Sequence, residues 1–139
     1  MMVIVPSHKI GTSYSFSQLS AAYNADPQKE ADASFLIYRG EEVLALCLRH
    51  KYHPEPGEVW VGDKAAVAAW GKTVAGLKGK STIPVYHSPG GAKFYQFKGH
   101  FVITGDTDDP QELAKRKAHV ALSRIIYLKP VVTDQKTGW

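Results

Sequence analysis

Apolar residues recur at helical spacing in three stretches of the chain. The first stretch predicts a helix from about Ser15 that ends at Asn24-Ala25-Asp26-Pro27, because proline disfavours helical geometry in the preceding residue. The second helix is expected to begin at Asp63, as its N-cap, and to stop at Gly79. The third begins with the capping pattern Asp109-Pro110-Gln111-Glu112. The second helix carries an apolar stripe that should face a core: Val67, Trp70, Val74 and Leu77.

Shorter apolar runs between these helices have the length and residue types of strands. The runs 35–38 and 43–49 are joined by a short glycine-containing turn, which predicts a hairpin. Both are apolar on two faces, as expected of central strands. The turn Ser88-Pro89-Gly90-Gly91, expected to be type II, joins a second pair over 82–87 and 93–104. Further strands are expected at 3–5, 58–61 and 120–128.

The longest predicted strand has two unlike faces. Alternation places Tyr95, Phe97, Gly99, Phe101 and Ile103 on a core face, opposite a mixed face of Phe94, Gln96, Lys98, His100 and Val102. Consecutive strands paired by hairpins predict an α+β fold. We expect a curved, mostly antiparallel sheet or open β-barrel with about three packed helices. One domain should span 1–139, with 130–139 as a tail.

Composition adds a mild basic bias to this picture. The 139 residues have a formal net charge of +4, which suits a polyanionic partner without requiring one. The single cysteine, Cys47, lies in an apolar run and is expected to be buried. No apolar run approaches the roughly 20 residues of a membrane span, and the first residues lack the features of a signal peptide. We therefore expect a cytoplasmic location, or a nuclear one in a eukaryote, and no membrane partner.

The residue patterns give little support to catalysis. A covalent mechanism lacks a nucleophile motif, and His50 and His53 lie in a proline-rich loop without the further ligands of a metal site. Gly71-Lys72-Thr73 is not a phosphate loop, because Ala66 stands where the motif needs glycine. We therefore predict a binding module with no catalytic residues, no metal and no cofactor.

Basic residues interleaved with aromatic ones favour a nucleic acid as the partner, because cations neutralise phosphates and rings stack on unpaired bases. The predicted phosphate ligands are Arg49, His50, Lys51, Lys64, Lys93 and Lys98. The predicted base-pocket residues are Tyr52, His53, Trp60, Tyr86 and His87, with Gln96 on the mixed strand face.

The stretch from Val59 to Thr104 resembles the SRA (YDG) domain and its relatives in the PUA-like superfamily. The similarity rests on a strand ending Val59-Trp60-Val61-Gly62-Asp63, the helix to Leu77, the strand 83–87, and the aromatic strand around Gly99. The family's Tyr-Asp-Gly signature falls at Phe97-Lys98-Gly99, where only the glycine matches. The aspartate that holds the base edge in the family is therefore absent there, and Asp63 is the nearest substitute.

This resemblance implies a reader of double-stranded DNA that flips a modified base, most simply a modified cytosine, into an aromatic pocket. A side chain from His50 to His53 would then fill the gap in the stack. Related readers occur in modification-dependent restriction proteins. A PUA-like RNA-binding domain, a small enzyme of another type and a protein-interaction module remain alternatives, and the oligomeric state stays open.

Overall fold

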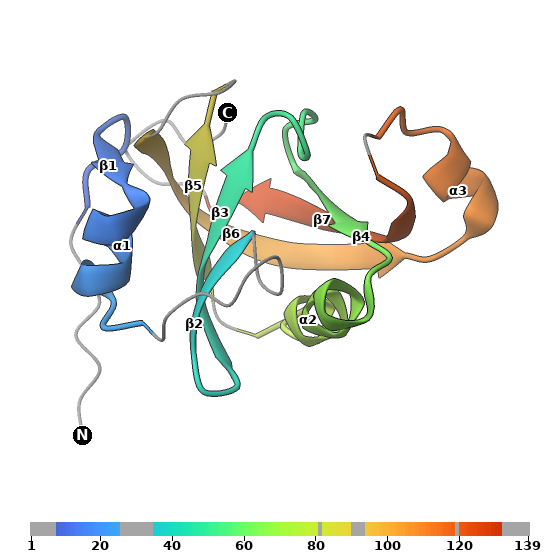
Figure 1. Ribbon diagram of the computed structural model, residues 1–139, viewed down its shortest axis with the longest axis horizontal. Helices are drawn as coiled ribbons and strands as arrows, with labels where there is room; N and C mark the ends of the chain where they lie inside the picture. Colours follow the sequence, from blue (N-terminus) through green and yellow to red (C-terminus); the bar gives the residue numbers. More distant parts are fainter. Residues whose placement is uncertain (1–7, 26–34, 81, 90–93, 119, 132–139) are drawn as a thin grey trace.

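A curled sheet of seven strands forms the centre of the fold (Figure 1). This computed structural model describes residues 8–25, 35–80, 82–89, 94–118 and 120–131. The strands are β1 (Ser13–Ser15), β2 (Leu36–Arg39), β3 (Glu42–Arg49), β4 (Glu58–Gly62), β5 (Ile83–Ser88), β6 (Phe94–Thr107) and β7 (Leu122–Pro130). Their order is β2-β3-β5-β6-β7-β4, with β1 paired to β6.

The pairing confirms the predicted α+β class with a mostly antiparallel sheet. Neighbouring strands run antiparallel throughout this sheet except β3 and β5, which are parallel. The predicted hairpin of β2 and β3 is present, with Gly40 at a φ of +62° in its turn. The strand expected at 3–5 and the glycines of the turn at 88–91 lie outside the described residues.

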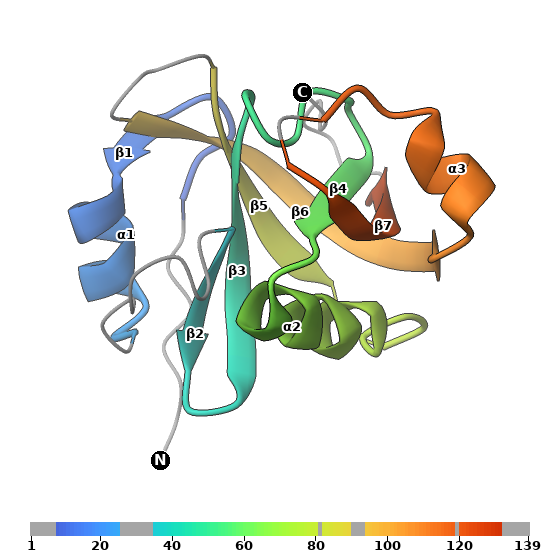
Figure 2. The same ribbon diagram turned by 45° about the vertical axis from the view of Figure 1, so that its right-hand side comes forward.

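Three helices pack around the sheet, as predicted (Figures 1 and 2). Helix α1 (Phe16–Ala22) follows Ser15, its N-cap, whose hydroxyl accepts a hydrogen bond from the Gln18 N–H in a capping box. The chain leaves the helix direction at Asn24, whose φ is +50°. Helix α2 (Ala65–Ala75) packs its predicted stripe against the core. The short helix α3 (Pro110–Ala114) is capped by Asp109, buries none of its residues, and lies beyond the far end of β6 (Figure 1).

Two apolar clusters lie on opposite faces of β5. The main core includes Val85 together with β2, β3, β4, the inner face of α2 and the second half of β6. The second cluster, which we call the aromatic core, lies under α1 and contains Leu19, Tyr23, Ile37, Ala45, Cys47, Tyr86 and Phe97. Cys47 is buried there as predicted, and burial raises the pKa of its thiol.

A β-bulge in β6 lets one strand serve both clusters. Val85 pairs with Gly99 while the next residue, Tyr86, pairs with Phe97, so Lys98 is an extra residue in the ladder. Gly99 has a φ of +103°, a conformation that glycine adopts readily and other residues do not. Phe97 therefore belongs to the aromatic core and Phe101 to the main core. The residues predicted as core from Tyr95 to Ile103 do line the interior, but the bulge divides them between the two clusters, so the prediction that they share one face was wrong.

Four further features of the helices and strands differ from the predictions. The N-cap of α2 is Lys64, so the prediction that Asp63 caps this helix was wrong. The helix ends at Ala75, and turns continue to Gly79, where φ is +74°. The prediction that β2 is a central strand was wrong, because it lies at one end of the sheet. It is nevertheless buried on both faces, since Leu36 and Tyr38 belong to the main core and Ile37 to the aromatic core. Strand β7 extends to Pro130, which pairs with Phe101, so the sheet includes the start of the expected tail.

Candidate nucleic-acid interface

The residues predicted to hold a base do not line one cavity. They occupy three places: the loop 50–57 with β4, the two faces of β5 with the neighbouring end of β6, and the start of α2. The chemistry of each place decides what it can bind.

Tyr86 lies inside the aromatic core. Its side chain has no exposed surface, and its ring packs 5.0 Å from Phe97. Its hydroxyl lies 2.8 Å from the Tyr23 hydroxyl and 2.5 Å from Nδ1 of His8, which itself stacks on Tyr14. Burial raises the pKa of Tyr86, and the hydrogen bond with Tyr23 raises it further. This position leaves no ring face open for a base, so Tyr86 contributes to stability.

His87 faces the other side of β5 and belongs to a basic group. Its ring lies edge-on to that of His50 at 5.9 Å, and its pKa is lowered to about 4 by burial, with smaller contributions from Lys98 and His50. Nζ of Lys98 donates to Oε1 of Gln96 at 2.6 Å. Gln96 in turn donates to the Gly11 carbonyl. Three predicted site residues therefore lie close to the end of β3: His87, Gln96 and Lys98.

His53 holds the edge of β4 in place. Its Nδ1 accepts the Trp60 backbone N–H at 3.0 Å, and only 4% of the residue is exposed. Burial lowers the pKa of His53 to about 3, with a smaller contribution from His87, so the ring is neutral and Nδ1 stays an acceptor. The structure thus places His53 beneath the loop, where its ring supports the backbone of Trp60.

A cavity of about 610 Å³ opens beside Trp60. The loop and β4 form one wall, and the segment from α3 to residue 117 forms the other. The lining residues are Pro54, Glu55, Glu58, Trp60, Glu112, Lys115, Arg116 and Lys117. The cavity therefore combines one large ring with six charged side chains.

An ion pair joins the two walls. Arg116 donates from Nε and Nη2 to the two carboxylate oxygens of Glu58, at 3.2 and 3.0 Å, and from Nη1 to the Glu112 carbonyl. Nε1 of Trp60 donates to Glu58 Oε1 at 2.8 Å. The hydrogen bonds to Glu58 raise the pKa of Arg116. Because α3 buries no residue of its own, these bonds hold it as a wall of the cavity.

The loop also carries exposed cations. Arg49, His50 and Lys51 are exposed at the end of β3. The Arg49 guanidinium lies 6.0 Å from the centre of the half-buried Tyr52 ring, and Lys51 Nζ lies 5.5 Å from it. Four predicted residues therefore lie on one surface, and the same loop continues into the cavity wall at Pro54.

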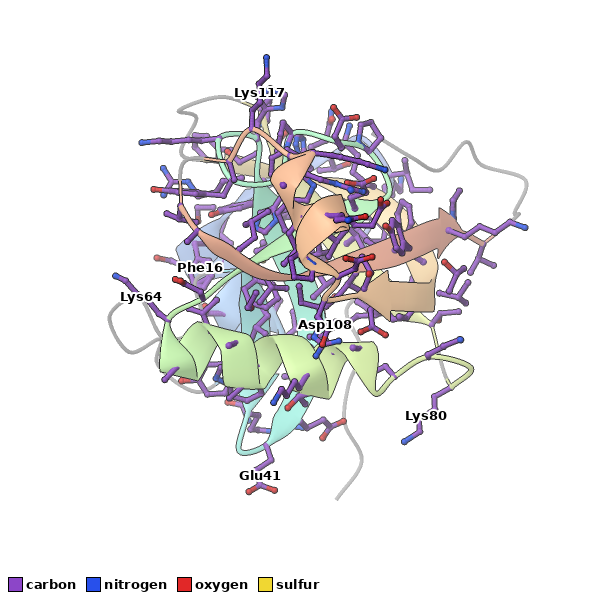
Figure 3. The ribbon with its side chains drawn as sticks, turned by 90° about the vertical axis from the view of Figure 1, so that its right-hand side faces the viewer. Phe16, Glu41, Lys64, Lys80, Asp108 and Lys117 are labelled. Atoms are coloured by element: carbon purple, nitrogen blue, oxygen red, sulfur yellow. The ribbon has the colours of Figure 1, made fainter. Side chains whose placement is uncertain are left out.

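The remaining predicted residues lie elsewhere. Asp63 and Lys64 are exposed at the start of α2, and Figure 3 shows Lys64 well apart from Lys117. Lys93 lies outside the described residues. In the part of the chain that the structure describes, no group of three or more metal-binding side chains comes together, and no helix is long and apolar enough to cross a membrane.

Neither the known family models nor the curated proteins matched this sequence. The structure, however, is similar to the crystal structure of SUVH5 SRA in complex with fully methylated CG DNA. The similarity covers 99% of both chains, with a TM-score of 0.60 and 11% sequence identity. This chain has an SRA-like fold. The resemblance inferred from the stretch 59–104 is thereby confirmed at the level of the fold.

Sequence reasoning missed several residues of this SRA-like domain. Glu58 and Arg116, which join the cavity walls, are 58 positions apart, and each looks like an ordinary surface charge in the sequence. His8 and Tyr23, whose side chains bind the Tyr86 hydroxyl, lie 78 and 63 positions away from it in the chain. No local pattern marks such pairs.

Proposed function

We propose that this protein is a reader domain that binds double-stranded DNA and recognises a modified base, most simply a modified cytosine. The base would leave the duplex and enter the cavity beside Trp60. The protein would act by binding, without catalysis, as the reader module of a modification-dependent restriction protein. The observation that carries the proposal is the 610 Å³ cavity with Trp60 in its wall, next to a basic loop, in an SRA-like fold.

The cavity offers what an extruded base needs. An indole ring can stack on the base, and stacking of this kind contributes roughly 1–3 kcal/mol. Glu58 supplies carboxylate oxygens for the donors of a base edge, while the adjacent Arg116 and Lys115 supply donors for its acceptors. Glu58 would thus take the place of the family aspartate that is absent at Lys98. Extruding a base costs a few kcal/mol, which these contacts must offset.

The exposed loop would bind the phosphates. Arg49, His50 and Lys51 are exposed beside the cavity wall, and Lys98 is close to the same end of the sheet. Because His53 is buried under Trp60, the side chain that fills the gap in the stack would come from His50, Lys51 or Tyr52. Lys51 carries a positive charge, which favours a position near the phosphates.

Binding titrations with matched duplexes test the proposal. Labelled duplexes with unmodified or modified cytosine, and an RNA duplex of the same sequence, are titrated by fluorescence anisotropy at several salt concentrations. We expect DNA to bind more tightly than RNA, the modified duplex more tightly than the unmodified one, and the affinity to fall steeply with salt. Equal affinity for all duplexes, or no salt dependence, would refute a modified-DNA reader.

Two variants with a matched control assign the surfaces. Lys51→Met should weaken binding to all DNA duplexes alike and lower by about one the slope of log affinity against log salt concentration. The control Lys78→Met, at an exposed lysine beyond α2, should change neither the affinity nor this slope. Trp60→Leu should reduce the preference for the modified duplex by roughly tenfold, in line with the loss of one stacking contact. Circular dichroism must show that the Trp60 variant is folded, because this residue is only 7% exposed.

A further inference from the structure

A groove lies between helix α2 and the turn that joins β2 to β3. It consists of two adjoining cavities of about 190 and about 330 Å³, which share Glu41 and Thr73 in their linings. The turn precedes β3 and the loop 50–57 follows it, so the eight residues of the strand separate them by about 23 Å. Figure 3 shows Glu41 below α2 and Lys117 at the opposite end of the molecule. A ligand in this groove would therefore leave the proposed DNA-binding surface uncovered.

The floor of the groove is apolar. Val43, Trp70 and Leu77 line it, and each is only partly buried while it packs against the main core. The Trp70 ring lies 4.8 Å from the Tyr38 ring, which supports it from beneath. Covering such apolar surface contributes roughly 25 cal/mol per Å². The floor thus favours an occupant with apolar side chains.

The wall formed by α2 presents small side chains. Ala69 and Thr73 are exposed and lie four positions apart, so they share one side of the helix. The Thr73 hydroxyl donates to the Ala69 carbonyl at 3.2 Å, so its hydrogen is already used. Small side chains allow the axis of a second helix to approach closely. The 11 residues of α2, about 16 Å long, offer such a helix about three turns of contact.

The charged residues that line the groove are both acidic. Glu41 and Glu42 are exposed, and neither makes a side-chain hydrogen bond or ion pair with another described residue. The whole chain has a net charge of +4, so the groove is opposite in sign to the protein around it. Two carboxylates repel phosphate, which makes a nucleic acid a poor occupant, and they attract lysine or arginine side chains. The groove therefore combines apolar contact with a preference for positive charge.

We propose that this groove docks an amphipathic helix of a partner protein. The apolar side chains of that helix would lie against Trp70 and Leu77, with lysine or arginine residues beside Glu41 and Glu42. A helix that lays its apolar face into a groove is a recurring mode of peptide recognition. The inference is independent of the reader function, because the groove and the basic loop lie at opposite ends of β3. The domain would hold DNA at one end and a partner protein at the other.

Selection from a phage-displayed library of random peptides tests the proposal. The peptides have about 16 residues, enough for roughly four helical turns. The wild-type domain is the immobilised target, and soluble Ala69→Arg protein is added in excess to remove peptides that bind outside the groove. We expect the selected peptides to carry apolar residues at helical spacing with lysine or arginine beside them. Selection of no peptide, or of peptides without basic residues, would overturn the proposal.

Affinity measurements with a selected peptide assign the residues of the groove. The double variant Glu41→Gln, Glu42→Gln should weaken binding roughly tenfold, in line with the loss of two ion pairs. Ala69→Arg places a long charged side chain in the groove and should weaken binding at least as much. The controls Asp63→Asn and Ala21→Arg make the same kinds of change at exposed positions outside the groove and should stay within about twofold of the wild type.

Circular dichroism checks that each variant is folded. Unchanged peptide affinity in both groove variants would overturn the assignment of the site. Sedimentation of the domain alone tests the rival occupant, a second copy of this chain. We expect the wild type and Ala69→Arg to sediment identically. A wild-type dimer that Ala69→Arg dissociates would overturn the proposal, because the groove would then hold another copy of the domain.

Discussion

The buried His53 should make the stability of this domain depend on pH. In the folded protein its pKa is about 3, against 6.5 for a histidine in the unfolded chain. Between these values the unfolded state binds more protons than the folded state, so the free energy of unfolding falls as the pH falls below 6.5. At about 1.4 kcal/mol per pH unit, the loss between pH 6.5 and about pH 5 is about 2 kcal/mol.

Urea denaturation followed by tryptophan fluorescence at about pH 8 and about pH 5 measures this loss. His87, whose pKa is lowered to about 4, also reduces the stability in acid, so the comparison needs His53→Gln in the same buffers. The glutamine carbonyl can still accept the Trp60 N–H but does not titrate. We expect the wild-type protein to lose about 2 kcal/mol more than the variant over this range.

His53→Leu separates the hydrogen bond from the titration. This variant leaves the Trp60 N–H without its acceptor, so it should be less stable than His53→Gln at about pH 8 by about 1–3 kcal/mol. The pKa of His53 can also be measured directly from its ring proton by NMR. Equal pH dependence in the wild type and His53→Gln, or a His53 ring that titrates near 6.5, would refute the reasoning.

Two glycine substitutions test the packing of the fold. Gly99→Ala should lower the free energy of unfolding by about 1–3 kcal/mol, because the φ of +103° at the bulge is strained for alanine. As a control, Gly105→Ala should lower it by less than half as much, because the added methyl group would meet no atom within 4 Å. Gly71→Ala would place its methyl 2.5 Å from Cγ1 of Val61. Overpacking of about 1–3 kcal/mol should outweigh the gain of about 1 kcal/mol in helix propensity, and Val61→Ala in the same chain should relieve part of the loss. Thermal and urea unfolding measure both effects, and an unchanged stability of Gly99→Ala or Gly71→Ala would contradict the corresponding contact.

Several parts of the fold followed from local sequence. The stripe on α2, the Asp109 cap of α3 and the hairpin of β2 and β3 all appear as predicted. Each depends on residues a few positions apart, whose spacing and backbone preferences act within one element. The resemblance of the stretch 59–104 also pointed to the correct fold.

The candidate site was only partly predictable. The basic loop was identified, since Arg49, His50 and Lys51 are adjacent in sequence and exposed in the structure. The sequence did not show which aromatic side chains are buried in the core and which line the cavity. Tyr86 and Trp60 look alike as candidates, yet one is enclosed by rings from α1 and β6 and the other forms the wall of a cavity.

The sequence by itself determined most elements of this protein, though not β1, together with its α+β class and its basic loop, because spacing, capping and charge are local properties of the chain. Only the tertiary structure decided which rings are buried, how the bulge at Gly99 divides β6 between two cores, and how Arg116 meets Glu58 across the cavity. These features depend on strand register and on contacts between residues far apart in the chain. A shift of one residue in that register reverses which face a side chain occupies, so no local pattern can specify them.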